Sequence, residues 1–178
     1  MKIIGICGSP RKGNTEFLLR EALKAARKKG AETELILLRK KKIKFCKGCD
    51  DICSKTHRCV IRDDMDEIYE KIKSANVLII GTPTYFDNVS GIMKNFIDRT
   101  DPLCGQIKNK NVGLVITGGA PSSILEKTSL RIMKNFCKIH GMKVKWTLSI
   151  KAYKKCEVNK NKKAIEKARK LGERLAEQ

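Results

Sequence analysis

The sequence predicts a three-layer α/β/α sandwich around a five-stranded parallel sheet with the strand order 2-1-3-4-5. Short apolar runs rich in β-branched residues alternate five times with longer segments of helical periodicity. Two of these runs, residues 3–7 and 77–80, are apolar throughout, as expected for strands covered on both faces. Such an alternation requires right-handed crossovers, which place helices on both sides of the sheet.

The first half of the chain contains two predicted strands and two predicted helices. The strand at residues 3–7 leads through a loop into a helix at residues 16–29, which carries an apolar face. Gly30 is a natural helix stop, and a second strand follows at residues 34–38. Acidic residues at positions 64 and 67 then resemble a helix N-cap, and that helix runs to about residue 74.

The second half continues the alternation from the central strand at residues 77–80. Val144, Trp146, Leu148 and Ile150 alternate with polar residues, which predicts a last strand at an edge of the sheet. The remaining elements are a strand at residues 112–117 and helices at residues 90–100, 122–140 and 162–176. We expect one domain over residues 1–178, with a cysteine-rich loop insertion at about residues 39–62.

Composition narrows the class of protein. The chain of 178 residues is long enough to bury its own core, has no apolar run of 18 residues and shows no signal-peptide pattern. We therefore expect a soluble, cytoplasmic protein with no membrane contact. In a reducing compartment, the eight cysteines are not expected to form disulfides, and their uneven spacing indicates metal chemistry.

The net charge of +20, from 39 basic and 19 acidic residues, indicates an anionic partner or ligand. The basic residues are spread over every predicted helix, which favours a generally basic, solvated surface. A basic zinc-knuckle domain that binds nucleic acid is a remote alternative. Only 5% of the residues are aromatic, and none is interleaved with a basic stripe, so we expect no nucleic-acid partner.

The loop after the first predicted strand is suited to bind phosphate. A strand, a loop and a helix in succession leave unpaired N–H groups and a favourable dipole at the helix N-terminus. Glycines allow close backbone approach, Arg11 adds fixed charge, and short side chains add donors. The loop reads Gly8-Ser9-Pro10-Arg11-Lys12-Gly13-Asn14-Thr15.

This loop matches neither of two common phosphate-binding patterns. The Walker A sequence and the dinucleotide fingerprint Gly-x-Gly-x-x-Gly are both absent from it. An ordinary strand-to-helix turn is the alternative interpretation. Loops rich in Gly, Pro and Thr also follow two later strands, at residues 81–88 and 117–121. Since the carboxyl ends of parallel strands share one crevice, these loops favour a ligand site.

Four cysteines within fourteen residues form a candidate metal centre: Cys46, Cys49, Cys53 and Cys59. Such a compact loop suits a cubane iron–sulfur cluster, whose ligands surround one bulky core. Structural zinc more often uses two cysteine pairs separated by a longer hairpin or helix. A zinc site and a vestigial or thiol-redox loop remain the alternatives.

Taken together, these motifs resemble the NADPH-dependent FMN reductase-like branch of the flavodoxin-like superfamily over nearly the whole chain. The phosphate loop, the stretch at residues 82–99 and Thr117-Gly118-Gly119 carry this resemblance. Within the branch, Cys46-Lys47-Gly48-Cys49 with Cys53, Cys59 and Asp63-Asp64-Met65 is similar to the iron–sulfur flavoproteins. The spacing departs from the usual Cys-x2-Cys-x2-Cys of that group, because Asp50-Asp51-Ile52 adds one residue before Cys53.

The resemblance implies FMN and a set of residues that bind it. The first loop would hold the phosphate, the second would lie along the isoalloxazine ring, with Tyr85 and Phe86 as an aromatic wall, and the third would approach the ring edge. The implied FMN-binding residues are Ser9, Arg11, Lys12, Gly13, Asn14, Thr15, Pro83, Thr84, Tyr85, Phe86, Asn88, Thr117, Gly118 and Gly119.

The resemblance also implies a redox flavoprotein. FMN and a 4Fe–4S cluster on Cys46, Cys49, Cys53 and Cys59 would pass electrons between a one-electron carrier and a two-electron acceptor. No catalytic protein side chain is then needed. The expected partners are an acidic ferredoxin-like carrier or a small-molecule acceptor, with assembly as a homodimer or homotetramer. A cluster-free NAD(P)H-dependent FMN or quinone reductase is the main alternative.

Overall fold

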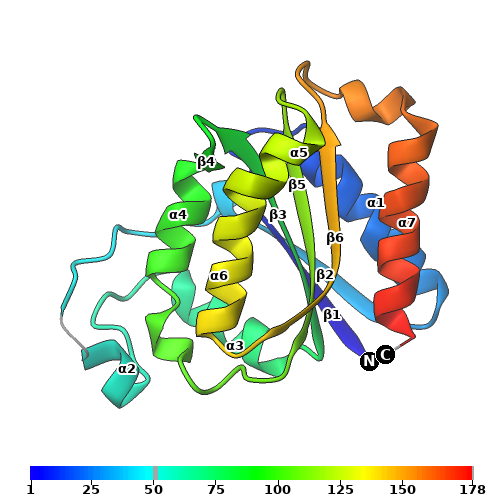
Figure 1. The fold of residues 1–178 in the computed structure, drawn as a ribbon. Helices are drawn as coiled ribbons and strands as arrows, with labels where there is room; N and C mark the ends of the chain where they lie inside the picture. Colours follow the sequence, from blue (N-terminus) through cyan, green and yellow to red (C-terminus); the bar gives the residue numbers. More distant parts are fainter. Residues whose placement is uncertain (50–51, 178) are drawn as a thin grey trace.

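The computed structural model describes residues 1–49 and 52–177, and one parallel sheet organises them (Figure 1). Its strands lie in the order β2-β1-β3-β5-β6, and every neighbouring pair in this order is parallel. In chain order these five strands are 2-1-3-4-5, which confirms the flavodoxin-like fold that the sequence predicts. The bounds are β1 Lys2–Cys7, β2 Glu32–Leu37, β3 Val77–Tyr85, β5 Asn111–Gly118 and β6 Lys143–Lys151.

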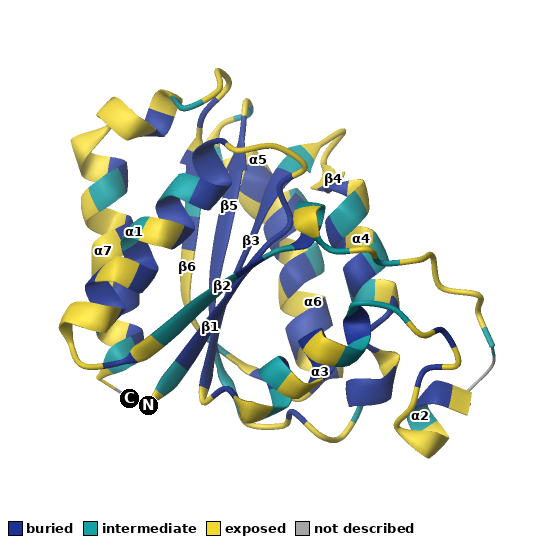
Figure 2. Cartoon of the chain, turned by 180° about the vertical axis from the view of Figure 1, so that it is seen from behind, coloured by how far each residue is buried: buried dark blue, intermediate teal, exposed yellow. Residues whose placement is uncertain are grey.

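Helices cover both faces of the sheet. The α1 and α7 helices pack side by side on one face, and α3, α4 and α6 cover the other (Figure 1). The α1 and α7 helices turn their buried residues toward the sheet (Figure 2). The bounds are α1 Asn14–Lys28, α2 Ile52–Thr56, α3 Met65–Ser74, α4 Gly91–Asp98, α5 Ser122–Leu125, α6 Arg131–Ile139 and α7 Lys162–Ala176.

The sheet separates two hydrophobic cores. Alternate residues of β1 point to opposite faces, so that Ile4 and Ile6 join the α3, α4 and α6 side while Ile3 and Cys7 join the α1 and α7 side. The central strands are buried on both faces, as their apolar sequences predict. No helix in the described part of the chain is long and apolar enough to span a bilayer.

The structure differs from the sequence-based expectation at several places: the Asp64 carboxylate accepts from the Lys42 N–H and does not cap α3, and the short helix α2 was not expected. The strand β3 extends into a hairpin with the strand β4, Asn88–Val89. A strand of two residues is too short to show a periodic pattern in the sequence. The single helix expected at residues 122–140 consists of α5, a π-helical turn at Glu126–Leu130 and α6. Periodicity alone does not detect such a turn, because the apolar face continues through it.

Close packing between α1 and α7 makes Gly172 a sensitive position. A Cβ atom added there would lie 1.9 Å from the Ala22 carbonyl oxygen, which is backbone and cannot swing away. We predict that Gly172→Ala lowers the free energy of unfolding by about 1–3 kcal/mol, because the two helices must separate. Urea denaturation followed by circular dichroism measures this change.

Gly91→Ala is the matched control, since a Cβ atom there meets nothing within 4 Å. Its stability should stay within about 0.5 kcal/mol of the parent protein. Equal stability of the two variants would contradict the close packing of α1 and α7.

Candidate functional site

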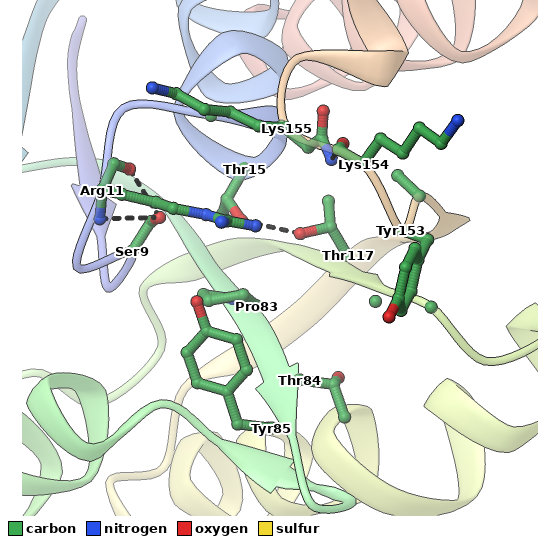
Figure 3. Close-up of a pocket in the computed structure, with 15 residues that line it drawn as sticks. Ser9, Arg11, Thr15, Pro83, Thr84, Tyr85, Thr117, Tyr153, Lys154 and Lys155 are labelled. Atoms are coloured by element: carbon green, nitrogen blue, oxygen red, sulfur yellow. Dashed lines mark hydrogen bonds between the residues drawn. The ribbon is translucent and has the colours of Figure 1, made fainter.

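A cavity of about 550 Å³ opens at the carboxyl edge of the sheet (Figure 3). The carboxyl ends of β3 and β5 line it together with the segments that follow β1, β5 and β6, because all four strands end at this edge. Its size falls within the range of small-molecule and cofactor sites. We call it the flavin cavity below, after the ligand that the sequence resemblance predicts for these loops.

The first of these loops is held in shape by its own side chains. The Ser9 hydroxyl donates to the Arg11 carbonyl oxygen at 2.7 Å and accepts from the Arg11 N–H at 3.4 Å. Gly8 lets the loop approach α4, since a Cβ atom there would lie 2.6 Å from Met93 Cε. The Ser90 hydroxyl donates to the Gly8 carbonyl oxygen and accepts from the Met93 N–H, so that it also caps α4. The loop is therefore fixed before any ligand arrives.

Two predicted phosphate donors have structural partners within the protein. The Thr15 and Thr117 hydroxyls are buried and lie 2.7 Å apart, which joins the first loop to the third. The Asn14 amide donates to the Lys154 carbonyl oxygen and accepts from the Val158 N–H. Both side chains thus fix the relative positions of the loops that line the cavity.

The cations along the cavity create a site for an anion. Arg11, Lys154 and Lys155 line it, and none of the described lining residues is acidic. A Cβ atom at Gly13 would meet only Arg11 Cγ, at 4.0 Å, so the space beside this peptide is open. Open backbone at the start of α1 beside a guanidinium suits the phosphate of a mononucleotide.

The second loop brings only one of its two predicted aromatic residues to the cavity. Tyr85 lines it, with Pro83 and Thr84 beside it (Figure 3). Phe86 and Asp87 form the tight turn between β3 and β4, with φ of 47° and 55°. Paired positive φ angles are typical of a two-residue hairpin turn. Phe86 is consequently fully exposed at the tip and does not line the cavity.

The third loop approaches the segment after β6 closely. A Cβ atom at Gly119 would lie 2.7 Å from the Tyr153 ring, so glycine permits this ring to pack against the backbone. Tyr85 and Tyr153 lie on different sides of the cavity (Figure 3). These two aromatic rings provide apolar surface for a planar ligand.

Most residues predicted for FMN line this one cavity, and four lining residues were not predicted. The predicted residues that do not line it are Lys12, Phe86 and Asn88. The side-chain oxygen of Asn88 accepts a hydrogen bond from the Val89 N–H instead. The residues that the sequence reasoning missed are Ala152, Tyr153, Lys154 and Lys155. They follow a parallel strand at the same edge, and that rule alone would have identified them.

The four predicted cysteine ligands line a second cavity, of about 520 Å³, which we call the cysteine cavity. Cys53 and Cys59 are buried, Cys49 is half-buried and Cys46 is exposed. The Sγ atoms of Cys49 and Cys53 lie 3.9 Å apart. Asp98, Arg99 and Asp101, from the end of α4 and the turn after it, complete the wall. Asp50 and Asp51, which lengthen the cysteine spacing, lie outside the described residues.

Metal binding at these thiols requires that they converge and that they lose their protons. Among the described residues, no three His, Cys, Asp or Glu side chains are placed to bind a single metal ion. Burial, together with the neighbouring thiols of Cys49 and Cys59, raises the pKa of Cys53 to about 12. A metal centre must therefore displace protons to bind here.

The cysteine cavity lies away from the flavin cavity of the same chain. The two cavities share no lining residue, and α2 projects beside the C-terminal end of α4, far from the edge at which the loops gather (Figure 1). Since β2 ends at that edge, the cysteines that follow it would be expected there. The chain instead leaves β2 and runs along α4 before it reaches the cysteines.

A buried ion pair closes the base of the cysteine segment. The Arg99 guanidinium donates to both carboxylate oxygens of Asp63, at 2.7 and 3.0 Å, and neither side chain is appreciably exposed. Burial alone would raise the pKa of Asp63, but hydrogen bonds from Arg99, Lys44 and Met65 outweigh it and lower that pKa. The pair therefore stays ionised at neutral pH.

Comparison with known proteins agrees with this geometry. The profile of the NADPH-dependent FMN reductase family matches residues 1–151. An iron–sulfur flavoprotein of Methanocaldococcus jannaschii is 45% identical over 80% of this chain and 74% of its own length. An iron–sulfur flavoprotein of Methanosarcina thermophila is 38% identical over 80% of this chain and 75% of its own length.

A solved structure described as a flavone reductase shares the fold. It superposes with a TM-score of 0.78 at 21% identity and covers 99% of this chain and 62% of its own. The sequence relatives and the matching family profile identify the family as well as the fold. This chain belongs to the iron–sulfur flavoproteins of the NADPH-dependent FMN reductase family and is an FMN-dependent oxidoreductase.

Proposed function

We propose that this protein holds FMN in the flavin cavity and a 4Fe–4S cluster in the cysteine cavity. It would pass electrons between a one-electron carrier and a two-electron acceptor. The observation that carries this proposal is the gathering of all four cysteines around one cavity in an FMN-dependent oxidoreductase. The cluster-free reductase remains the alternative that iron analysis tests.

The flavin cavity supports FMN through its donors and its shape. Arg11 and the backbone at the start of α1 would bind the phosphate, and Lys154 and Lys155 on the rim would add positive potential. The backbone around Gly118 and Gly119 would face the edge of the ring system, and Tyr85 and Tyr153 would supply apolar contact. Thr15, Asn14 and Ser90 would act indirectly, because they fix the loops.

The cysteine cavity supports a cluster rather than a single zinc ion. It offers four sulfurs around about 520 Å³, whereas zinc requires ligands converging within about 2.3 Å of one point. The Gly48 N–H lies 3.4 Å from Cys46 Sγ and the Ile61 N–H lies 3.5 Å from Cys59 Sγ. Hydrogen bonds of this kind tune the potential of protein-bound clusters.

The bound groups would supply the redox chemistry, one electron at the cluster and two at the flavin. The residues of this chain would bind and orient them. Because the two cavities lie apart on one chain, the exchange partner of the cluster could be the flavin of a neighbouring copy, in a homodimer or homotetramer. The net charge of +20 would steer an acidic ferredoxin-like carrier toward the protein.

We predict that Arg11→Ala weakens FMN binding, because it removes a charge-assisted hydrogen bond from the phosphate. The expected loss is about 1.5–3 kcal/mol, or roughly 10- to 150-fold in affinity. Quenching of flavin fluorescence during titration of the apoprotein measures it. Lys12→Ala is the matched control, since Lys12 is the next cation along the loop and does not line the cavity. Equal affinity losses in both variants would contradict the assigned phosphate site.

We predict that Cys46→Ala and Cys49→Ala each abolish the cluster and leave FMN bound, because the flavin loops lie elsewhere. Iron and acid-labile sulfide are assayed after anaerobic reconstitution, with flavin measured on the same sample. The parent protein should contain about four irons per chain. Cys137→Ala is the control, because Cys137 belongs to α6 and its side chain is buried in the core. Stoichiometric zinc, or no metal in the parent protein, would favour the cluster-free reductase.

We predict that reduction by an acidic carrier protein depends strongly on ionic strength. Its association rate should fall at least about tenfold as salt rises from about 0.01 M to 0.15 M, because screening shortens the reach of the positive surface. Stopped-flow absorbance at the flavin band measures the rate. Reduction by a small neutral dye is the control and should change little. A rate that does not depend on salt would exclude electrostatic steering.

A further inference from the structure

The cysteine segment leaves and rejoins the fold at one narrow place, and Arg99 occupies it. The guanidinium donates through Nη1 to the Lys44 carbonyl oxygen at 2.6 Å and through Nη2 to the Ile61 carbonyl oxygen at 3.3 Å. Lys44 lies two residues before the first cysteine ligand, and Ile61 lies two residues after the last. One side chain therefore contacts both ends of the segment that carries all four thiols.

Asp63 completes this closure. Its carboxylate receives the bidentate pair from Arg99 and also accepts from the Lys44 N–H at 2.8 Å and the Met65 N–H at 3.0 Å. The part of the chain that enters the cysteine segment, the part that leaves it and the start of α3 thus all contact a single buried ion pair. Bidentate geometry of this kind is specific to arginine, since lysine offers only one nitrogen.

Arg99 also faces the thiols themselves. It lines the cysteine cavity together with all four cysteines, and its side chain is fully buried. Its Nε–H is buried without a hydrogen-bond partner in the described part of the chain. A buried donor of this kind is costly unless an acceptor is supplied. A thiolate or cluster sulfur in the cavity would provide one.

We propose that Arg99 is a positioning residue for the cluster, which closes the base of the cysteine segment and places a positive charge on the cavity wall. This inference rests on the proposed function for the identity of the bound group. The closure itself does not depend on iron, because every hydrogen bond that forms it lies within the protein. The two parts can therefore be tested separately.

The first test uses iron-free protein. The Arg99→Lys variant keeps the positive charge and loses the bidentate hydrogen bonds to Asp63. Alkylation of Cys53 and Cys59 by iodoacetamide should then accelerate about tenfold or more, because the segment opens locally. Mass spectrometry of the labelled peptides gives the rates. Cys137 is fully buried in the core and serves as an internal control that should stay protected. Unchanged rates at Cys53 and Cys59 would overturn the closure.

A matched variant separates local opening from general loss of stability. Leu175→Ala removes a fully buried side chain on the opposite face of the sheet and does not touch the cysteine segment. Cys53 and Cys59 should remain protected in it. If Leu175→Ala exposes them as much as Arg99→Lys does, the closure is overturned. Should Arg99→Lys fail to fold, Asp63→Asn tests the same pair, because its amide cannot accept all the bonds that the carboxylate accepts.

The second test uses reconstituted protein and separates geometry from charge. Both Arg99→Lys and Arg99→Gln should bind at most about half of the parent's iron, because both lose the bidentate closure. Only Arg99→Gln should shift the reduction potential of the remaining cluster to more negative values, since a nearby positive charge favours the reduced form. Dye-mediated redox titration measures the potential.

The outcomes distinguish this inference from the proposed function. Parent-like iron content and potential in both variants would overturn the role of Arg99 toward the cluster. An unchanged potential in Arg99→Gln would overturn its electrostatic part. If the parent protein itself binds no iron, the proposed function fails, and the thiol-labelling result still decides whether Arg99 closes the segment.

Discussion

Parallel pairing of β1 with β3 is the constraint on which the functional site depends. Parallel strands begin at one edge of a sheet and end at the other, so their following loops meet without any further instruction from the sequence. The pairing sets Cys7 beside Gly81, and the Gly8 N–H then donates to the Gly81 carbonyl oxygen at 2.8 Å. The loop after β1 is thereby placed against the carboxyl end of β3. The hydrogen bond between the Thr15 and Thr117 hydroxyls and that from the Asn14 amide to the Lys154 carbonyl oxygen bring in the other two loops.

The α4 helix connects this site with the cysteine cavity. At its N-terminus Ser90 contacts the phosphate loop, and just past its C-terminus Arg99 contacts both ends of the cysteine segment. Eight helical residues separate these contacts, which corresponds to roughly 12 Å at 1.5 Å per residue. One rigid element therefore holds both sites at a fixed separation. Phe45 and Cys46, in the cysteine segment, are exposed.

The sequence predicted the fold well because its strongest signals are periodic. Apolar strands such as residues 77–80 and amphipathic helices such as α7 depend on local pattern, and the strand order follows from the handedness of the crossovers. The place of the loop after β1 in the cavity was also predictable, because the loop follows a parallel strand at that edge. The carboxyl end of β6 obeys the same rule, yet Tyr153, Lys154 and Lys155 were missed because they form no recognisable motif.

Other features depend on tertiary structure, and no local pattern encodes them. Phe86 turns outward because the β3–β4 hairpin requires two positive φ angles, which a list of aromatic residues does not reveal. The partners of Arg99 lie 36 to 55 residues away in the chain, so nothing near Arg99 indicates its burial. The path of the chain after β2 likewise determines that the cysteines lie beside α4 instead of beside the flavin loops.

The most direct test of this account is the visible absorption spectrum of anaerobically purified protein, recorded with iron and flavin content on the same sample. Protein that holds both FMN and the cluster should show the resolved bands of oxidised flavin above a broad shoulder from the cluster. Acid treatment should bleach the shoulder and release the flavin as FMN. Flavin bands without the shoulder, in protein that contains zinc or no metal after reconstitution with iron and sulfide, would contradict the cluster and leave the cysteine cavity without its proposed role.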